Sequence, residues 1–447
     1  MRRFLPICLL ACLLRSCVPI AAQQAPIPTS TALSGNPFYV KKSWPIGGSG
    51  NWDYLTMDVA ARRLYIAHGH AVQVVDVDSG TVVGEIPGFR DAHAIALDDT
   101  GQFGFVSDGP ADAVAVFNRR GLTVESTIFI GCSPRSIVFE PQSRLVVAVC
   151  GAAVAPPRGT RPIPTSAQPS GQRSAGSTCN QQRPNQASGP DIVYGVSHVV
   201  AIDAEKRSVI RDFNIPGDFR YAQADGEGNL YFSVGPAEVI GFSSGRETTD
   251  RMMPPRIARL DATGIVGAAN RQTDAQSNQA NGESVHFNAS ESGNAGPLIN
   301  FIGLSSACSN PQGLAIDGRH QRLFLACDTQ QFVVLDSMRG NAVNSLTTGP
   351  GDDVLAYDQE RGLIFVANGG GYGSLTIIQQ DANTDSYAVI QNLPTLARAR
   401  TLAVDPSSGA VYLVTDLHGV DLTKAGGIGT LHFDPIAGSF QVMVVGH

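Results

Sequence analysis

The sequence predicts an all-β protein, a seven-bladed β-propeller made of four-stranded antiparallel blades. Three observations support this fold class. A short apolar strand that ends in an acidic residue occurs seven times along the 447 residues. Each copy is followed by a polar turn and by further strands rich in β-branched residues. Most copies are separated by about 40 residues, which is the length of a propeller blade.

The first strand of each repeat is the most regular part of the unit. The seven copies lie at 55–58, 95–98, 137–140, 222–225, 314–317, 355–358 and 402–405, and each ends in Asp or Glu. A second strand follows the turn, as at 64–67, and most units continue with a third, as at 72–77. A solenoid would repeat after one or two strands, and a sandwich would not repeat one motif seven times, so the pattern favours a propeller.

Two of the repeats carry insertions of about 45–50 residues. We place them at 151–197 in blade 3 and at 262–297 in blade 4, where Pro, Ser, Gln, Asn and Gly predominate. Segments with so few apolar residues are expected to be poorly ordered appendages. The first should overhang the end of the channel at which the first strands begin, and the second should lie on the opposite face. An excursion at 235–255 precedes the third strand of blade 4, and 238–242 is an alternative for that strand.

The N-terminal segment is expected to close the ring. Residues 38–46 have the pattern of a fourth strand with no first three, and blade 7 ends with the strand at 440–445. We therefore expect the N-terminal strand to complete blade 7 on its outer edge, so that no open edge remains between the first and last blades. The propeller domain then spans 38–447.

The first 22 residues have the features of a signal peptide. Arg2 and Arg3 precede an apolar stretch at 4–14 that is too short to span a membrane, and cleavage is expected after Ala22. Residues 23–37 are interpreted as a disordered linker, and lipid attachment at Cys12 or Cys17 is an alternative. No later apolar run is long enough for a membrane span. The protein is therefore predicted to be periplasmic or secreted.

Export places the remaining cysteines in an oxidising compartment, where such residues tend to pair. Cys308 precedes the first strand of blade 5 and Cys327 ends its second strand, so their Cα atoms should lie close enough for a disulfide. Cys132 and Cys150 occupy the same places in blade 3, which predicts a second disulfide and leaves Cys179 unpaired. The alternative is a Cys150–Cys179 disulfide.

Composition and motifs limit the possible functions. The chain has 32 Lys and Arg against 39 Asp and Glu, and this acidic balance argues against non-specific binding to nucleic acid or to anionic membranes. The sequence has no haem-attachment, zinc-protease, serine-hydrolase or phosphate-loop motif. No cofactor is assigned on this basis, and we expect a monomer.

Several segments resemble one known family. Trp52-Asp-Tyr-Leu55, the strand at 310–317, the strand at 322–327 and Phe365-Val-Ala-Asn-Gly369 are similar to repeats of the YncE/YVTN family of exported seven-bladed propellers. The resemblance covers 38–447 apart from the two insertions. It implies the fold and export, whereas most members of the family have no assigned role. Lactonase-like and cofactor-binding enzymes share the fold, which is analogy only.

One residue of each blade is expected at the mouth, which we define as the end of the central channel where the first strands begin. Alignment of the repeats gives Asp53, His93, Arg135, Arg220, Gln312, Asp353 and Arg400. The order of the blades places Arg400 between Asp353 and Asp53, so these three side chains can form a paired triad.

Arg135 and Arg220 are neighbours in this ring, flanked by His93 and Gln312, and no ring carboxylate lies beside them. Because a guanidinium binds carboxylate or phosphate with two hydrogen bonds, the pattern predicts an anion site. The alternative is that both arginines pair with acids of nearby loops, such as Asp108 or Asp218.

A metal site is a second possibility at the mouth. His68 and His70 end the second strand of blade 1, and His93 begins the first strand of blade 2 on the same side. Three imidazoles would suit zinc or copper. The alternative is that His68 and His70 hydrogen-bond to loop backbone.

Three functions are compatible with these features. The first is an exported, non-catalytic propeller that binds a small anionic ligand or a partner protein at the mouth. The second is a propeller enzyme, either a lactonase-like hydrolase or a metal-assisted oxidoreductase. The third is a cell-envelope scaffold that binds through its outer edges and loops.

Overall fold

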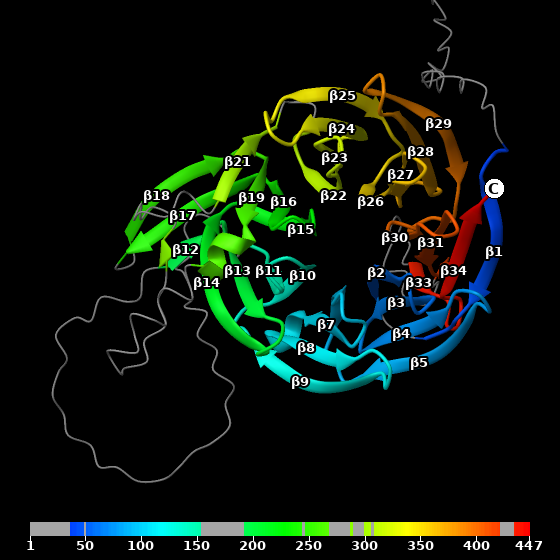
Figure 1. Cartoon of the computed structure of the whole chain (residues 1–447), viewed down its shortest axis with the longest axis horizontal. Coiled ribbons are helices and arrows are strands. Elements are labelled where there is room, and N and C mark those ends of the chain that lie inside the picture. The colour runs from blue at the N-terminus through cyan, green and yellow to red at the C-terminus, as the bar shows by residue number, and fades with distance from the viewer. Residues whose placement is uncertain are drawn as a thin grey trace, which may run out of the picture.

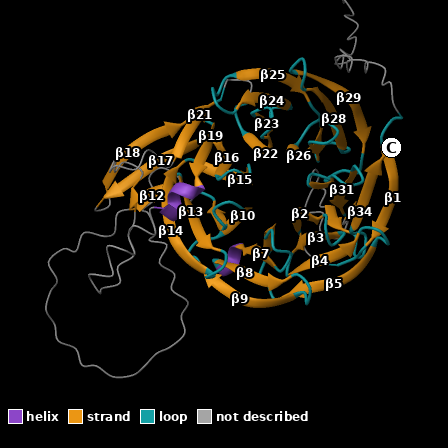
Figure 2. Ribbon diagram, in the orientation of Figure 1, coloured by secondary structure: helices purple, strands orange, loops and turns teal. Residues whose placement is uncertain are grey.

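A computed structural model describes residues 36–48, 51–152, 192–243, 246–267, 287–288, 299–304, 308–420 and 433–447. Seven four-stranded antiparallel blades form a closed ring around a central axis (Figure 1), which confirms the predicted fold class. Each blade runs from an inner strand beside the axis to an outer strand at the circumference. Strands predominate throughout, as Figure 2 shows.

The blades follow the order of the chain. Blade 1 contains β2 (Trp52–Asp58), β3 (Arg63–His68), β4 (Ala71–Asp76) and β5 (Thr81–Pro87), and blade 2 contains β6 (Ala92–Leu97), β7 (Phe103–Asp108), β8 (Ala113–Asn118) and β9 (Thr123–Phe129). Blade 3 contains β10 (Pro134–Glu140), β11 (Leu145–Cys150), β13 (Val196–Asp203) and β14 (Ser208–Pro216), and blade 4 contains β15 (Asp218–Ala224), β16 (Asn229–Gly235), β19 (Arg256–Asp261) and β21 (Ile299–Gly303). Blade 5 contains β22 (Pro311–Asp317), β23 (Arg322–Cys327), β24 (Gln331–Asp336) and β25 (Ala342–Thr347), and blade 6 contains β26 (Asp352–Asp358), β27 (Leu363–Asn368), β28 (Ser374–Asp381) and β29 (Ser386–Pro394). Blade 7 contains β30 (Leu402–Asp405), β31 (Ala410–Thr415), β34 (Gln441–Gly446) and β1 (Tyr39–Pro45).

The hydrophobic core lies between neighbouring blades. The second strand of each blade is covered on both faces, so its residues are apolar without alternation. In β3, for example, Leu64, Tyr65 and Ile66 are completely buried. Outer strands face solvent and carry exposed residues, such as Val82 and Val83 in β5. This burial accounts for the apolar second strands that the sequence predicts, as at 64–67.

The acidic residue that ends each inner strand caps the turn to the second strand. Asp58 Oδ1 accepts a hydrogen bond from the Ala61 backbone N–H, and Asp358 Oδ1 accepts one from the Arg361 N–H. Such side-chain caps favour a tight turn over continued strand. Some of these acids also join neighbouring blades, because Arg119 of blade 2 is hydrogen-bonded to Asp58 of blade 1.

The N-terminal strand closes the ring, as predicted. β1 pairs antiparallel with β34 and forms the outer strand of blade 7. Just before β1, Phe38 is buried with its ring centroid 5.6 Å from that of Phe365 in blade 6. The Phe38 backbone N–H and carbonyl oxygen are also hydrogen-bonded to the side chain of Gln391 in β29.

Blade 4 has the third strand that was preferred from the sequence. β19 pairs with β16 on one side and β21 on the other, so the alternative at 238–242 is wrong. That segment belongs to β17 (Ala237–Ser243), which forms a hairpin with β18 (Arg246–Met253). A third strand, β12 (Ile192–Tyr194), completes this small sheet outside the ring (Figure 1).

The described ends of the two insertions contain regular structure. The first ends in β12 and in the start of β13, and within the second, 262–267 are helical. β20 (Phe287–Asn288) pairs parallel with β14 of blade 3. The expected signal peptide, most of the linker, Cys179 and the central parts of both insertions lie outside the described residues. A two-stranded sheet, β32 (His418–Val420) with β33 (Phe433–Pro435), lies in the connection between β31 and β34 of blade 7.

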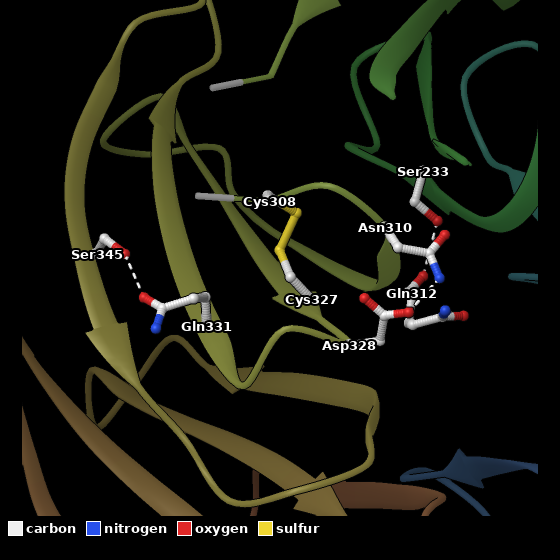
Figure 3. The surroundings of a disulfide bond; sticks show 8 residues. All are labelled: Ser233, Cys308, Asn310, Gln312, Cys327, Asp328, Gln331 and Ser345. Carbon is white, nitrogen blue, oxygen red and sulfur yellow. Dashed lines mark hydrogen bonds between the residues drawn. A yellow bond between two sulfur atoms is a disulfide. The ribbon is translucent and has the colours of Figure 1, made fainter. Parts of the chain in front are cut away.

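Both expected disulfides are present. Cys132–Cys150 and Cys308–Cys327 have Cα–Cα distances of 6.0 and 5.5 Å. Each joins the segment before an inner strand to the end of the second strand of the same blade, as Figure 3 shows for blade 5. Within the described residues, no helix has the length and apolar character that crossing a membrane requires.

Candidate functional site

At the mouth, the inner strand of most blades pairs irregularly with the second strand. In the first six blades the register between the inner and second strands shifts near the start of the inner strand, as between Trp52 and Leu55 in blade 1. A β-bulge of this kind bends the strand and re-aims its side chains. Six of the seven expected mouth residues lie within these shifts: Asp53, His93, Arg135, Arg220, Gln312 and Asp353. Arg400 lies just before β30.

Two tyrosines bridge the central channel. Tyr54 belongs to β2 and Tyr221 to β15, which lie on opposite sides of the ring (Figure 1), yet their ring centroids are 5.5 Å apart. Inner-strand side chains of blades 1 and 4 meet only by crossing the axis. Burial raises the pKa of Tyr221 to about 12. It also raises the pKa of Tyr54 well above its ordinary value, and Asp53 adds to that rise.

His93 and Asp53 form the shortest ionisable contact among the expected mouth residues. His93 Nδ1 lies 2.8 Å from Asp53 Oδ2, and His93 Nε2 lies 3.9 Å from Asp91 Oδ2. The hydrogen bond to Asp53 raises the pKa of His93, against the opposing effects of burial and of Arg135. The expected triad therefore differs, because Asp53 pairs with His93 of the next blade rather than with Arg400.

The other half of that triad is present. Arg400 Nε lies 3.6 Å from Asp353 Oδ2, and both side chains are partly exposed. Burial raises the pKa of Asp353, Arg400 opposes this, and Asp53 raises the pKa further. Arg220 also lowers the pKa of Asp353, so charged groups of blades 1, 4 and 7 act on this carboxyl group of blade 6.

The two arginines of blades 3 and 4 differ from each other. Arg220 Nε donates a hydrogen bond to Asp218 Oδ2 at 2.9 Å, so the alternative with a nearby acid holds for this residue. Arg135 is exposed and forms no ion pair with another described residue. Asp108, the other acid considered, accepts hydrogen bonds from the backbone N–H groups of Arg90 and Asp91. Of the three expected mouth arginines, Arg135 is the one that has no ion pair with an acid in the described part of the chain.

Gln312 contributes its backbone carbonyl group to a contact between neighbouring blades at the mouth. Its carbonyl oxygen accepts a 2.7 Å hydrogen bond from the Ser233 hydroxyl of blade 4, which ties blades 4 and 5 together at the mouth (Figure 3). The Gln312 side chain is partly exposed.

The three histidines considered for a metal site are not brought together. His68 is buried and its Nδ1 is hydrogen-bonded to Gln73 Oε1 at 2.9 Å. His70 is exposed, with its Nδ1 3.3 Å from the Phe89 carbonyl oxygen. His93 contacts Asp53 instead. Across the part of the chain that the structure describes, no group of three His, Cys, Asp or Glu side chains is arranged to hold a metal ion.

Sequence reasoning missed the tyrosines and Asp91. Tyr54 and Tyr221 each follow a mouth residue directly, and the same repeat position in the other five blades holds Ala94, Ser136, Gly313, Val354 and Thr401. Aromatic side chains at a position that is otherwise non-aromatic were therefore a visible signal. Their contact across the ring was not, because it depends on which blades face each other.

Comparison with known proteins supports the fold and nothing finer. No protein-family model matches the chain, and no curated protein sequence is significantly similar to it. Solved structures described as U3-55K and as RRP9 WD40 repeats each match with a TM-score of 0.56 and 8% identity, over 90% of this chain and 97% of theirs. A chain of the mitotic checkpoint complex matches with a TM-score of 0.51 and 11% identity, over 89% of this chain and 95% of that one. At these identities the likeness supports the propeller fold alone.

Proposed function

We propose that this protein is an exported, non-catalytic binding propeller that recognises a small ligand with a carboxylate or phosphate group at its mouth. Arg135 carries the proposal, since it is exposed beside the channel and has no ion pair within the described structure. Its counterparts Arg220 and Arg400 already contact acids. Export is supported by the two disulfides and by the N-terminal sequence, and the likeness to the YncE/YVTN family points the same way.

The other charges at the mouth limit the ligand. Four carboxylates lie at or beside the mouth: Asp53 and Asp91 contact His93, Asp218 contacts Arg220, and Asp353 contacts Arg400. Each further anionic group of a polyanion would add repulsion from these carboxylates, whereas a single anionic group at Arg135 would be paired with its guanidinium. Tyr54 and Tyr221 bridge the channel and would support the uncharged part of such a ligand. A compact ligand with a single anionic end therefore fits the arrangement best.

The proposal is tested by calorimetry on the mature protein with a panel of small monocarboxylates and phosphate monoesters. Charge-assisted hydrogen bonds contribute roughly 1.5–3 kcal/mol, so Arg135→Ala should weaken binding of the best ligand by about tenfold to a hundredfold. Arg120→Ala is the matched control, because Arg120 is an exposed arginine in the β8–β9 turn at the other end of the ring. Equal affinity in the Arg135→Ala and Arg120→Ala variants, or no binding by the unmodified protein, would refute the proposal.

A further inference from the structure

A second candidate site lies away from the mouth, between blades 4 and 5. A cavity of about 390 Å³ is lined by residues of β19, of β21 and of the turn between β24 and β25: Arg259, Asn300, Phe301, Ile302, Gly303, Ser337, Met338, Arg339 and Gly340. In an antiparallel blade that begins at the mouth, the turn from the third to the fourth strand lies at the opposite end. None of the expected mouth residues takes part.

One wall of this cavity is the edge of a sheet. β21 is the outermost strand of blade 4, because among the described strands it pairs with β19 alone. Four consecutive residues of β21, from Asn300 to Gly303, line the cavity. Since successive side chains of a strand point to opposite faces, a wall made of consecutive residues includes backbone as well as side chains. The edge of β21 that faces away from β19 pairs with no other described strand, so backbone N–H and C=O groups are open to pairing beside the cavity.

The lining is basic. It contains two arginines and no acidic residue. Arg259 is partly buried, and its Nε donates a 3.0 Å hydrogen bond to the neutral Asn229 side chain, with no carboxylate in ion-pair contact in the described structure. The side chain of Arg339 is 82% exposed, and its ion pair among the described residues is with Asp336, at 3.4 Å. A partly buried guanidinium without an acid is a favourable partner for an incoming carboxylate.

The opposite wall approaches closely enough to hold a ligand against this edge. A Cβ atom at Gly340 would lie 2.8 Å from Ile302 Cγ2, so the glycine lets the turn of blade 5 pack directly on β21. Exposed Met338 and the backbone of the turn form the rest of that wall. The volume lies in the range of small-ligand sites, which suits a few residues of extended chain.

We propose that this cavity binds an extended acidic peptide segment of a partner protein, which adds to β21 as a fifth strand and places a carboxylate at Arg259 and Arg339. The sheet edge supplies main-chain hydrogen bonds and the arginines select for acidic side chains, a division of roles typical of strand addition. This site lies beyond the proposed ligand site at the mouth, and neither depends on the other.

The test is fluorescence anisotropy with the mature protein and a labelled peptide of alternating Glu and Val residues. Two control peptides are needed: one with Lys in place of Glu, and one with the same side chains but alternate N-methylated amides, which cannot extend a sheet. Only the unmodified acidic peptide should bind. Arg259→Gln and Arg339→Glu should each weaken binding by at least about tenfold. Arg319→Glu is the matched control, since Arg319 is an exposed, ion-paired arginine of the same blade outside the lining.

Each other outcome overturns the proposal. If no peptide binds, or if the Lys peptide binds equally well, the arginines do not select an acidic segment. If the N-methylated peptide binds as tightly as the unmodified one, the peptide does not add to β21 as a strand. Affinity that is unaltered by both Arg259→Gln and Arg339→Glu, in variants with the thermal stability of the unmodified protein, places the peptide elsewhere. Arg135→Ala should leave peptide binding intact, which keeps this test separate from that of the mouth.

Discussion

At the scale of single residues, Arg400 and Asp353 show how the mouth balances its charges. Burial makes the ionised form of Asp353 unfavourable, Arg400 offsets this, and Asp53 adds repulsion. A carboxyl group whose pKa is raised on folding binds its proton more tightly in the native state. Its contribution to stability is therefore greatest below the ordinary Asp pKa and declines as pH rises through the native pKa.

We predict that Arg400→Gln lowers the free energy of unfolding at pH 7 by up to about 1 kcal/mol, the scale of a partly exposed ion pair. The loss should shrink as pH falls towards 4, because Asp353 then becomes protonated. Asp353→Asn should stabilise the protein at pH 7, and in that background Arg400→Gln should have little effect. Denaturant unfolding of the four proteins at both pH values measures these differences. A loss that persists in the Asp353→Asn background would show that Arg400 acts through another group.

Repeat alignment predicted seven mouth positions, but not all of the contacts that these residues make. It could propose them because corresponding positions of the repeats fall at the same point of each blade, and six of the seven lie in the bulges of the inner strands. It could not assign His93 to Asp53, since both lie in bulges whose side-chain directions follow from local backbone geometry. Nor could it choose between ring and loop acids for Arg220, because Asp218 is two residues away in the same strand.

At the scale of elements, blades 3 and 5 each contain one strand pair joined covalently. Cys132 and Cys308 lie just before β10 and β22, and their partners Cys150 and Cys327 end β11 and β23. Equal placement in two repeats made both disulfides predictable from sequence. The outlying sheet of β12, β17 and β18 was not predictable, because it joins segments from two different blades.

Replacing both Cys308 and Cys327 by alanine is expected to lower the free energy of unfolding by about 3 kcal/mol, the value for a loop of this length. Reductant should destabilise the unmodified protein and should have no effect on a variant that lacks all four bridged cysteines. Thermal unfolding with and without reductant measures this. Peptide mapping without reduction provides the control, and it should find Cys179 unbridged. A Cys179 disulfide in that map would contradict the assignment in blade 3.

At the scale of the whole molecule, the ring is a set of sheets that are stable only because each is covered on both faces. The first and last described strands, β1 and β34, belong to the same blade and are joined to each other by backbone hydrogen bonds. The sequence indicated this closure because residues 38–46 have the pattern of an outer strand, and no first three strands precede them in the chain. The N-terminal segment contacts three blades: Phe38 packs on Phe365 of blade 6, and Trp44 packs on Tyr412 of blade 7 and lies against Gly80 of blade 1.

Removal of this segment is therefore expected to open the ring between blades 7 and 1. We predict that a chain starting at residue 47 unfolds several degrees below one starting at residue 36, which keeps Phe38 and β1. Hydrogen exchange should rise first in β34 and β31, because β34 becomes an unprotected edge and the buried contacts of Phe38 and Trp44 are lost. A synthetic peptide of residues 36–48 should restore both the melting temperature and the protection of β34. If the two chains melt at the same temperature, or if exchange rises equally in all blades, closure by β1 does not hold the ring together.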